Sequence, residues 1–129
     1  MIIKIDFESD NPIYMQLKEQ LIEGIARGEI VAGEVLPSVR QLAEDIGINL
    51  HTVNKTYNIL KTEGYVTIDR RKGAVVNKIP HNDDGNSQCE LMENFKLILS
   101  QMHCKGITKQ QVHQRTEEIF KTFIVREGS

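Results

Sequence analysis

The sequence is short of the features that mark secreted and membrane-bound proteins. Its 129 residues include only two cysteines, and no apolar run approaches the roughly 20 residues of a membrane-spanning helix. No N-terminal stretch joins a charged segment to an apolar run, so no secretory signal is expected. We therefore expect a cytoplasmic protein without a membrane partner. Cys89 and Cys104 are then expected to be reduced thiols rather than a disulfide.

Patterns that carry catalysis or hold a metal are also missing. The sequence contains no nucleophile elbow, no P-loop and no paired-carboxylate arrangement. We therefore expect no enzymatic activity, no cofactor and no metal site. The spacing of Cys89, His103, Cys104 and His113 matches no standard zinc pattern. A metal-responsive sensor that uses these residues is kept as an alternative, to be tested by titration with zinc or cobalt.

Positive charge is scarce overall but concentrated in one region. The formal net charge is -2. Residues 1–48 hold four Lys/Arg and nine Asp/Glu, whereas residues 49–79 hold six Lys/Arg and two Asp/Glu. Counterion release on DNA depends on the local patch rather than on the total charge. An acidic total therefore does not exclude DNA binding by the middle of the chain.

The segment from Pro37 to Tyr65 predicts two helices joined by a tight turn. Ser38 is a strong N-cap for the first helix, and Gly47 suits the left-handed conformation just past its end. Asn49 is an N-cap candidate for the second helix, which Gly64 ends. The inward stripes are Val39, Leu42, Ala43 and Ile46 on the first helix and Val53, Tyr57 and Leu60 on the second. Two short helices with separate apolar faces predict a helix-turn-helix.

The outer face of the second helix carries side chains that suit DNA. They are small hydrogen-bonding groups and one cation: Asn49, His51, Thr52, Asn54, Lys55 and Asn58. Such groups fit base edges and phosphates in a major groove. Lys55 is expected to contact a phosphate, because a single ammonium carries little shape information.

After Gly64 the apolar period changes from helical to two. Val66, Ile68, Val75 and Val76 flank the run Asp69-Arg70-Arg71-Lys72-Gly73, which predicts a β-hairpin with a basic tip. Three cations at a turn can form an ordinary solvated loop. Their position directly after a predicted recognition helix instead favours a wing, which would follow the phosphate backbone or enter a minor groove.

The N-terminal segment predicts a strand and a helix. Ile3, Ile5 and Phe7 alternate with polar residues, as in a short strand. Asn11 and Pro12 predict the cap and the first position of a helix. Its buried side carries Tyr14, Leu17, Leu21 and Ile25, and its water-facing side carries Gln16, Lys18, Glu19 and Glu23.

The last fifty residues predict a polar linker and two helices. The first helix has an apolar stripe of Leu91, Phe95, Ile98, Leu99 and Met102, and the second has Val112, Ile119, Phe120 and Phe123. Thr108, with Gln111 three residues on, predicts a capping box for the second helix. A hairpin of this size is too small to fold alone. Its apolar faces are expected to pack on the preceding domain or on an identical subunit.

The stretch from PIYMQLKEQ to RRKGAVV resembles the N-terminal domain of GntR-type bacterial transcription regulators. Matching elements include LPS at 36–38, Arg40, TV at 52–53, EGY at 63–65 and Gly73. The resemblance covers roughly residues 5–79. The short two-helix tail is similar to that of the YtrA-type subfamily, which implies a dimerisation module.

The resemblance also implies which residues touch DNA. On the two helices these are Ser38, Arg40, Asn49, Leu50, His51, Thr52 and Asn54, and on the tip they are Arg70, Arg71, Lys72 and Gly73. Leu50 departs from relatives that place a base-reading arginine there. A leucine cannot form bidentate contacts to guanine, but it can touch a thymine methyl. Because Leu50 falls three residues before Val53, a core position is the alternative.

These patterns together predict a mainly α protein with a small β-hairpin. We expect a winged helix-turn-helix domain over residues 1–79, a polar linker over 80–89 and a two-helix dimerisation hairpin over 90–129. The expected function is a homodimeric repressor that reads a palindromic operator in double-stranded DNA through the 49–63 helix and the 69–73 wing. A small-molecule effector would act at the dimer interface or between the domains. The other alternative is a winged-helix adaptor that binds another protein.

Overall fold

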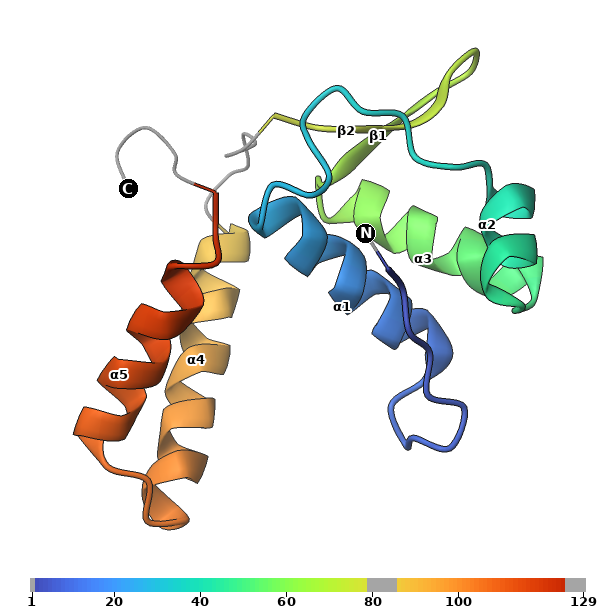
Figure 1. Ribbon diagram of the computed structural model, residues 1–129. Coiled ribbons are helices and arrows are strands. Elements are labelled where there is room, and N and C mark those ends of the chain that lie inside the picture. The colour runs from blue at the N-terminus through green and yellow to red at the C-terminus, as the bar shows by residue number, and fades with distance from the viewer. Residues whose placement is uncertain (1, 79–85, 125–129) are drawn as a thin grey trace. The chain divides into compact units, whose positions relative to one another are not determined.

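The computed structural model describes residues 2–78 and 86–124 and divides the chain into two compact units. We call the described residues 2–78 the winged unit and the described residues 86–124 the helical hairpin (Figure 1). The winged unit contains α1 (Ile13–Ala26), α2 (Val39–Ile46), α3 (Leu50–Thr62), β1 (Val66–Asp69) and β2 (Gly73–Val76). The helical hairpin contains α4 (Asn86–Cys104) and α5 (Lys109–Phe120). No helix within these residues is both long and apolar enough to cross a membrane.

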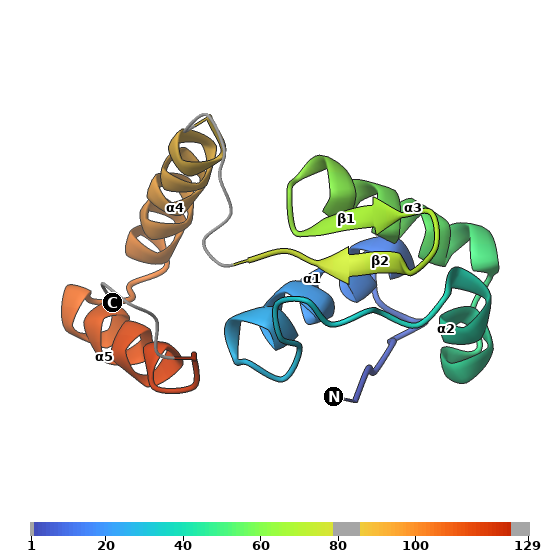
Figure 2. The same cartoon turned by 90° about the horizontal axis from the view of Figure 1, so that it is seen from above.

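The core of the winged unit is built around α3, which packs against α1, α2 and β1 (Figures 1 and 2). The predicted inward stripes of α2 and α3 are confirmed, since their members are buried or packed against the core. On α1 the stripe is confirmed for Leu17, Leu21 and Ile25, whereas Tyr14 is only half-buried. The buried apolar residues are Leu17, Leu21, Ile25, Ile30, Leu36, Leu42, Ala43, Val53, Tyr57, Leu60, Val66, Ala74 and Val76. Leu17, Val53 and Leu60 are fully buried. Burying a side chain of this size contributes about 1.5–3 kcal/mol, so these contacts fix the position of α3.

The helix-turn-helix forms as its capping residues predict. The Ser38 side chain accepts a hydrogen bond from the Gln41 backbone N–H at 3.1 Å and caps α2. Gly47 follows α2 in the left-handed conformation, with φ of 69°. The Asn49 side chain accepts from the His51 N–H at 2.8 Å and caps α3. Each cap satisfies a backbone donor that the helix itself leaves free.

The predicted β-hairpin is confirmed, and it gains a partner that the sequence did not predict. β1 and β2 pair antiparallel, from Val66 opposite Val76 to Asp69 opposite Gly73. The segment before α2 runs along the other side of β2, where Val35 forms an isolated bridge with Val75. The Leu36 N–H donates to the Ala74 carbonyl at 2.8 Å. The wing is therefore joined to the chain that leads into α2.

The strand predicted at Ile3, Ile5 and Phe7 is wrong. The backbone of residues 2–6 forms no strand, because side-chain amides of α1 take the place of a neighbouring strand. Gln16 accepts from the Asp6 N–H and donates to the Asp6 carbonyl, both at 2.9 Å. Gln16 was expected to face water, but it is only 8% exposed because its amide makes these bonds.

The start of α1 also differs from the prediction. The helix begins at Ile13 with Pro12 as its N-cap, and no side chain caps it. The Asn11 side chain donates instead to the Glu19 carboxylate at 3.2 Å. The predicted cap is therefore wrong, because Asn11 pairs with a charged acceptor two turns along the chain.

The helical hairpin forms, with two changes at its ends. Of the linker predicted over 80–89, residues 80–85 lie outside the described residues and 86–89 belong to α4. The Thr108–Gln111 capping box is confirmed. α5 ends at Phe120, so Phe123 lies in the turn after the helix, where its ring meets Phe120 edge-to-face at 5.5 Å.

Candidate nucleic-acid interface

The polar face of α3 is exposed because the opposite face is held in the core. Val53, Thr56, Tyr57 and Leu60 are buried, whereas Asn49, His51, Asn54, Lys55 and Asn58 are exposed. Thr52 is half-buried at the edge of this face. The helix thus presents amide, imidazole and ammonium groups along one side. We call these exposed residues the outer face of α3.

Two hydrogen bonds hold α3 against its neighbours. The Tyr57 hydroxyl donates to the Pro37 carbonyl at 2.6 Å, just before the cap of α2. The Thr56 hydroxyl donates to the Tyr14 carbonyl of α1 at 2.8 Å, and Thr56 is fully buried. Burial also raises the pKa of the Tyr57 phenol above its ordinary value, so the hydroxyl remains a protonated donor well beyond neutral pH. These bonds fix α3 relative to both neighbouring helices.

The Tyr57→Phe variant tests the first of these bonds. It removes one hydroxyl and leaves the Pro37 carbonyl without that donor, so we expect a loss of about 1–2 kcal/mol in the free energy of unfolding. The measurement is urea denaturation followed by circular dichroism. An unchanged midpoint in urea would show that the bond does not stabilise the winged unit.

The remaining predicted contact residues on the two helices are also accessible. Ser38 and Arg40 are exposed at the N-terminal end of α2. Leu50, the first residue of α3, is 44% exposed. The alternative that places Leu50 in the core is therefore wrong. Its side chain lies at the end of the helix that also carries Asn49 and His51.

The basic tip of the wing is shaped by Asp69. Its carboxylate accepts from the backbone N–H groups of Arg71 at 2.7 Å and Lys72 at 3.0 Å. These two bonds lower the pKa of Asp69 below its ordinary value. Arg70, Arg71, Lys72 and Gly73 are all exposed, and Gly73 adopts a positive φ of 97° that favours glycine. The tip therefore presents three cations on an ordered turn.

Comparison of Asp69→Ala with Asp69→Asn tests this role of the carboxylate. Both variants remove the negative charge, but only asparagine keeps an acceptor for the two N–H groups. We expect the alanine variant to bind DNA about threefold more weakly than the asparagine variant. The measurement is fluorescence anisotropy with a labelled duplex at pH 7. Folding lowers the pKa of Asp69, so its carboxylate contributes fully to the stability of the turn at any pH above the pKa of the unfolded chain. This contribution is lost as the pH falls through the lower pKa of Asp69 in the folded protein. Equal affinities for the two variants would contradict the assignment.

A shallow hollow of about 670 Å³ lies between α1 and α3, next to the outer face. Its lining includes Tyr14 and Lys18 from α1 and His51, Asn54 and Lys55 from α3. The Lys55 ammonium lies 3.8 Å from the centre of the Tyr14 ring. Sequence reasoning placed Tyr14 in the core and did not find this contact, which depends on how α1 and α3 cross.

The residues predicted for dimerisation gather on the helical hairpin but are left accessible. Leu91, Phe95, Ile98 and Phe120 are 46–64% exposed. Leu99, Met102, Val112, Ile119 and Phe123 are half-buried. α5 has no buried residue, and neither has the part of α4 whose side chains are described. The described residues of the hairpin therefore form no closed core among themselves.

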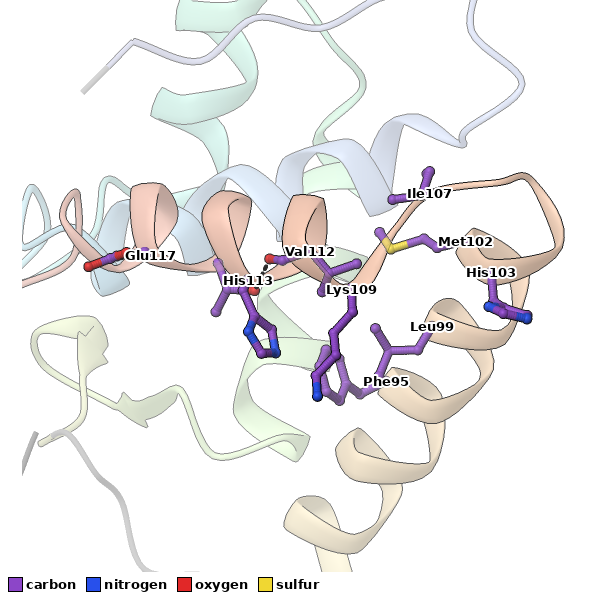
Figure 3. A pocket seen from close by; sticks show the side chains of 10 residues that line it. Phe95, Leu99, Met102, His103, Ile107, Lys109, Val112, His113 and Glu117 are labelled. Carbon is purple, nitrogen blue, oxygen red and sulfur yellow. Dashed lines mark hydrogen bonds between the residues drawn. The ribbon is translucent and has the colours of Figure 1, made fainter.

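An open apolar cleft of about 620 Å³ separates α4 from α5. Figure 3 shows the helices diverging from their connecting turn, with Phe95, Leu99 and Val112 on the walls. Lys109 and His113 project from α5 toward the space between the two helices (Figure 3). The cleft thus has a largely apolar lining with polar groups from both helices, because His103 of α4 also lines it.

The residues of the metal-sensor alternative do not form a cluster. Cys89 and Cys104 are free and exposed. Within residues 2–78 and 86–124, no three His, Cys, Asp or Glu side chains come together in a way that could hold a metal ion.

Helix α3 on α1 and α2, followed by a basic β-hairpin, defines a winged helix-turn-helix DNA-binding domain. Residues 13–76 match the family model described as bacterial regulatory proteins, gntR family. The chain is 31% identical over 119 residues to the HTH-type transcriptional repressor YtrA of Bacillus subtilis (strain 168), covering 92% of each chain. This chain belongs to the GntR family of bacterial transcription regulators, and it is YtrA-like. It is thus a DNA-binding regulator and not an enzyme.

Two solved structures extend the comparison. YtrA from Sulfolobus acidocaldarius, a GntR-family transcription factor, is 40% identical with a TM-score of 0.61 and covers 76% of this chain and 99% of its own. A transcriptional antiterminator from Listeria monocytogenes EGD-e has a TM-score of 0.85 over 98% of both chains. Its 24% identity shows a shared fold alone.

Proposed function

We propose that this chain is a homodimeric repressor that binds a palindromic operator in double-stranded DNA. The observation that carries the proposal is the exposed polar face of α3, fixed on its other side by a buried core and followed by an ordered basic wing. The name of the Bacillus subtilis relative, a transcriptional repressor, supports the direction of regulation. The site of action would be the cytoplasm, where bacterial DNA lies.

In this proposal the contacts divide between bases and phosphates. α3 lies in the major groove, where His51 and Asn54 reach base edges and Leu50 meets a thymine methyl. Arg40 approaches the groove from the first turn of α2. Thr52 contributes to sequence reading with His51 and Asn54. The phosphate contacts are made by Ser38, Asn49, Lys55 and the wing residues Arg70, Arg71, Lys72 and Gly73. These phosphate contacts would supply most of the affinity and make it sensitive to salt.

The helical hairpin supplies the dimer interface in this proposal. Its described apolar residues form no core of their own, and the cleft between α4 and α5 offers an apolar surface to a helix of a second copy. A closed pair has two-fold symmetry, so the two copies of α3 would face two inverted half-sites. An effector would act by changing the separation of these two helices.

The stoichiometry of the complex with DNA tests the proposal. A duplex obtained by selection for binding is compared with a duplex that retains one half-site. We expect two chains on the full duplex by analytical ultracentrifugation, and much weaker binding to the half-site because the linked second contact is lost. A single chain on the full duplex, with equal affinity for both duplexes, would contradict the homodimer.

A further inference from the structure

We propose that the hollow between α1 and α3 binds a phosphate of the DNA backbone, and that Tyr14 is the residue that positions Lys55 for it. This inference rests on the proposed DNA-binding function and adds α1 to the interface. The hollow shares four residues with the outer face of α3, and among them are His51 and Asn54. A duplex whose base edges meet these two side chains has its phosphate backbone along the margin of the groove. The hollow lies on that margin.

Of the two ammonium groups in the hollow, only one is available to an anion. Lys18 is paired with Glu63, whose carboxylate oxygens lie 2.9 Å and 3.0 Å from the Lys18 ammonium. Lys55 is exposed and has no carboxylate partner within the part of the chain that the structure describes. The Lys55 charge is therefore not neutralised, and the hollow has a local positive centre.

The aromatic ring restrains this positive centre without neutralising it. The Lys55 ammonium lies 3.8 Å from the centre of the Tyr14 ring, within the range of a cation–π contact. Such a contact uses the face of the ring on one side of the ammonium and leaves N–H donors on the other side for a phosphate oxygen. A lysine held in one place also loses less conformational entropy on binding than a free one.

Tyr14 is itself fixed in place, so the position of Lys55 follows from the packing of two helices. The Tyr14 side chain is half-buried. Its carbonyl accepts from the Thr56 hydroxyl at 2.8 Å, and Thr56 follows Lys55 directly on α3. The ring and the ammonium are thus joined at the point where α1 meets α3. This connection makes Tyr14 a positioning residue for a phosphate contact rather than a base-reading residue.

The test is a mutant cycle measured by the salt dependence of binding to the selected duplex. We expect Lys55→Gln to reduce the slope of log affinity against log salt by about one for each bound chain. Tyr14→Phe keeps the ring and should bind like the unchanged protein. Tyr14→Leu should weaken binding about two- to fivefold. Lys55→Gln should reduce the affinity for the duplex by a smaller factor in the Tyr14→Leu variant than in the unchanged protein. Lys61→Gln, which removes a cation from α3 outside the hollow, is the matched control.

The positioning role of Tyr14 would be overturned if Tyr14→Leu and Lys55→Gln reduced the affinity independently. In that case the loss in the double variant would equal the product of the two single losses. An unchanged salt slope for Lys55→Gln would overturn the phosphate site, provided that the unchanged protein prefers the selected duplex over a scrambled one. Absence of that preference would instead contradict the proposed function itself. The three results are therefore distinguishable.

A second measurement does not depend on how Tyr14→Leu folds. Single phosphates of the selected duplex are replaced in turn by neutral methylphosphonates. We expect at least one replacement that weakens binding of the unchanged protein but not of Lys55→Gln, because only the former has a charge to lose there. The inference is wrong if every replacement affects the two proteins by the same factor.

Discussion

A glutamate in place of Phe95 is expected to convert the protein from a dimer to a monomer and to lower its affinity for the operator about a hundredfold or more. Phe95 is 46% exposed in the single chain and lines the cleft between α4 and α5. In the proposed dimer the new carboxylate would be buried against apolar side chains without a partner, which is strongly unfavourable. The winged unit has its own core, so each monomer should keep weak, salt-sensitive binding.

Ser100→Glu is the matched control for this prediction. It adds the same charge on the side of α4 that lies opposite the apolar stripe. Ser100 follows Phe95 by five residues, and this spacing corresponds to a rotation of about 500°, which is one full turn and about 140° more. Ile98→Glu is a second variant on the stripe whose side chain does not line the cleft. Sedimentation should give a monomer for both stripe variants and a dimer for the control. A dimer that survives both stripe substitutions would place the subunit interface elsewhere.

The second large effect is expected from the double variant Arg40→Ala, Asn54→Ala. Each side chain is exposed on the surface that we propose meets the major groove. A base contact of this kind contributes about 1–3 kcal/mol, so the pair should lower affinity for the selected duplex by a factor of about 100 or more. Binding to unrelated DNA should fall much less, because most phosphate contacts remain.

Arg115→Ala controls for the loss of one positive charge, since Arg115 is exposed on α5 in the other unit. The double variant should also unfold at the same temperature as the unchanged protein, because neither side chain is buried. Fluorescence anisotropy with selected and scrambled duplexes measures both affinities. Equal losses on the two duplexes would show that Arg40 and Asn54 do not read sequence.

The helix-turn-helix was predictable because its signals are local. Ser38, Gly47 and Asn49 each meet a requirement of one helix end within three residues of chain, and the structure places each of them at the expected end. The apolar stripes follow from the helical period alone. The wing was predictable for the same reason, since alternation and a turn lie within eleven residues.

The features that were missed depend on segments that meet only after folding. The alternation at Ile3, Ile5 and Phe7 satisfies the pattern of a strand, but a strand also needs a neighbour. Gln16 and Gln20 of α1 provide that segment with side-chain partners instead. The Tyr14–Lys55 contact joins residues 41 positions apart, and no local pattern indicates the crossing that creates it.

Sequence selection from a random pool of double-stranded DNA tests the central claim most directly. The unchanged protein and the Arg40→Ala, Asn54→Ala variant are selected in parallel at low salt, and the enriched sequences are compared. The proposed function predicts that the unchanged protein enriches two inverted half-sites at a fixed spacing and that the variant enriches none. Enrichment of the same palindrome by both proteins would contradict the assigned contacts, and enrichment of no sequence by the unchanged protein would contradict operator recognition.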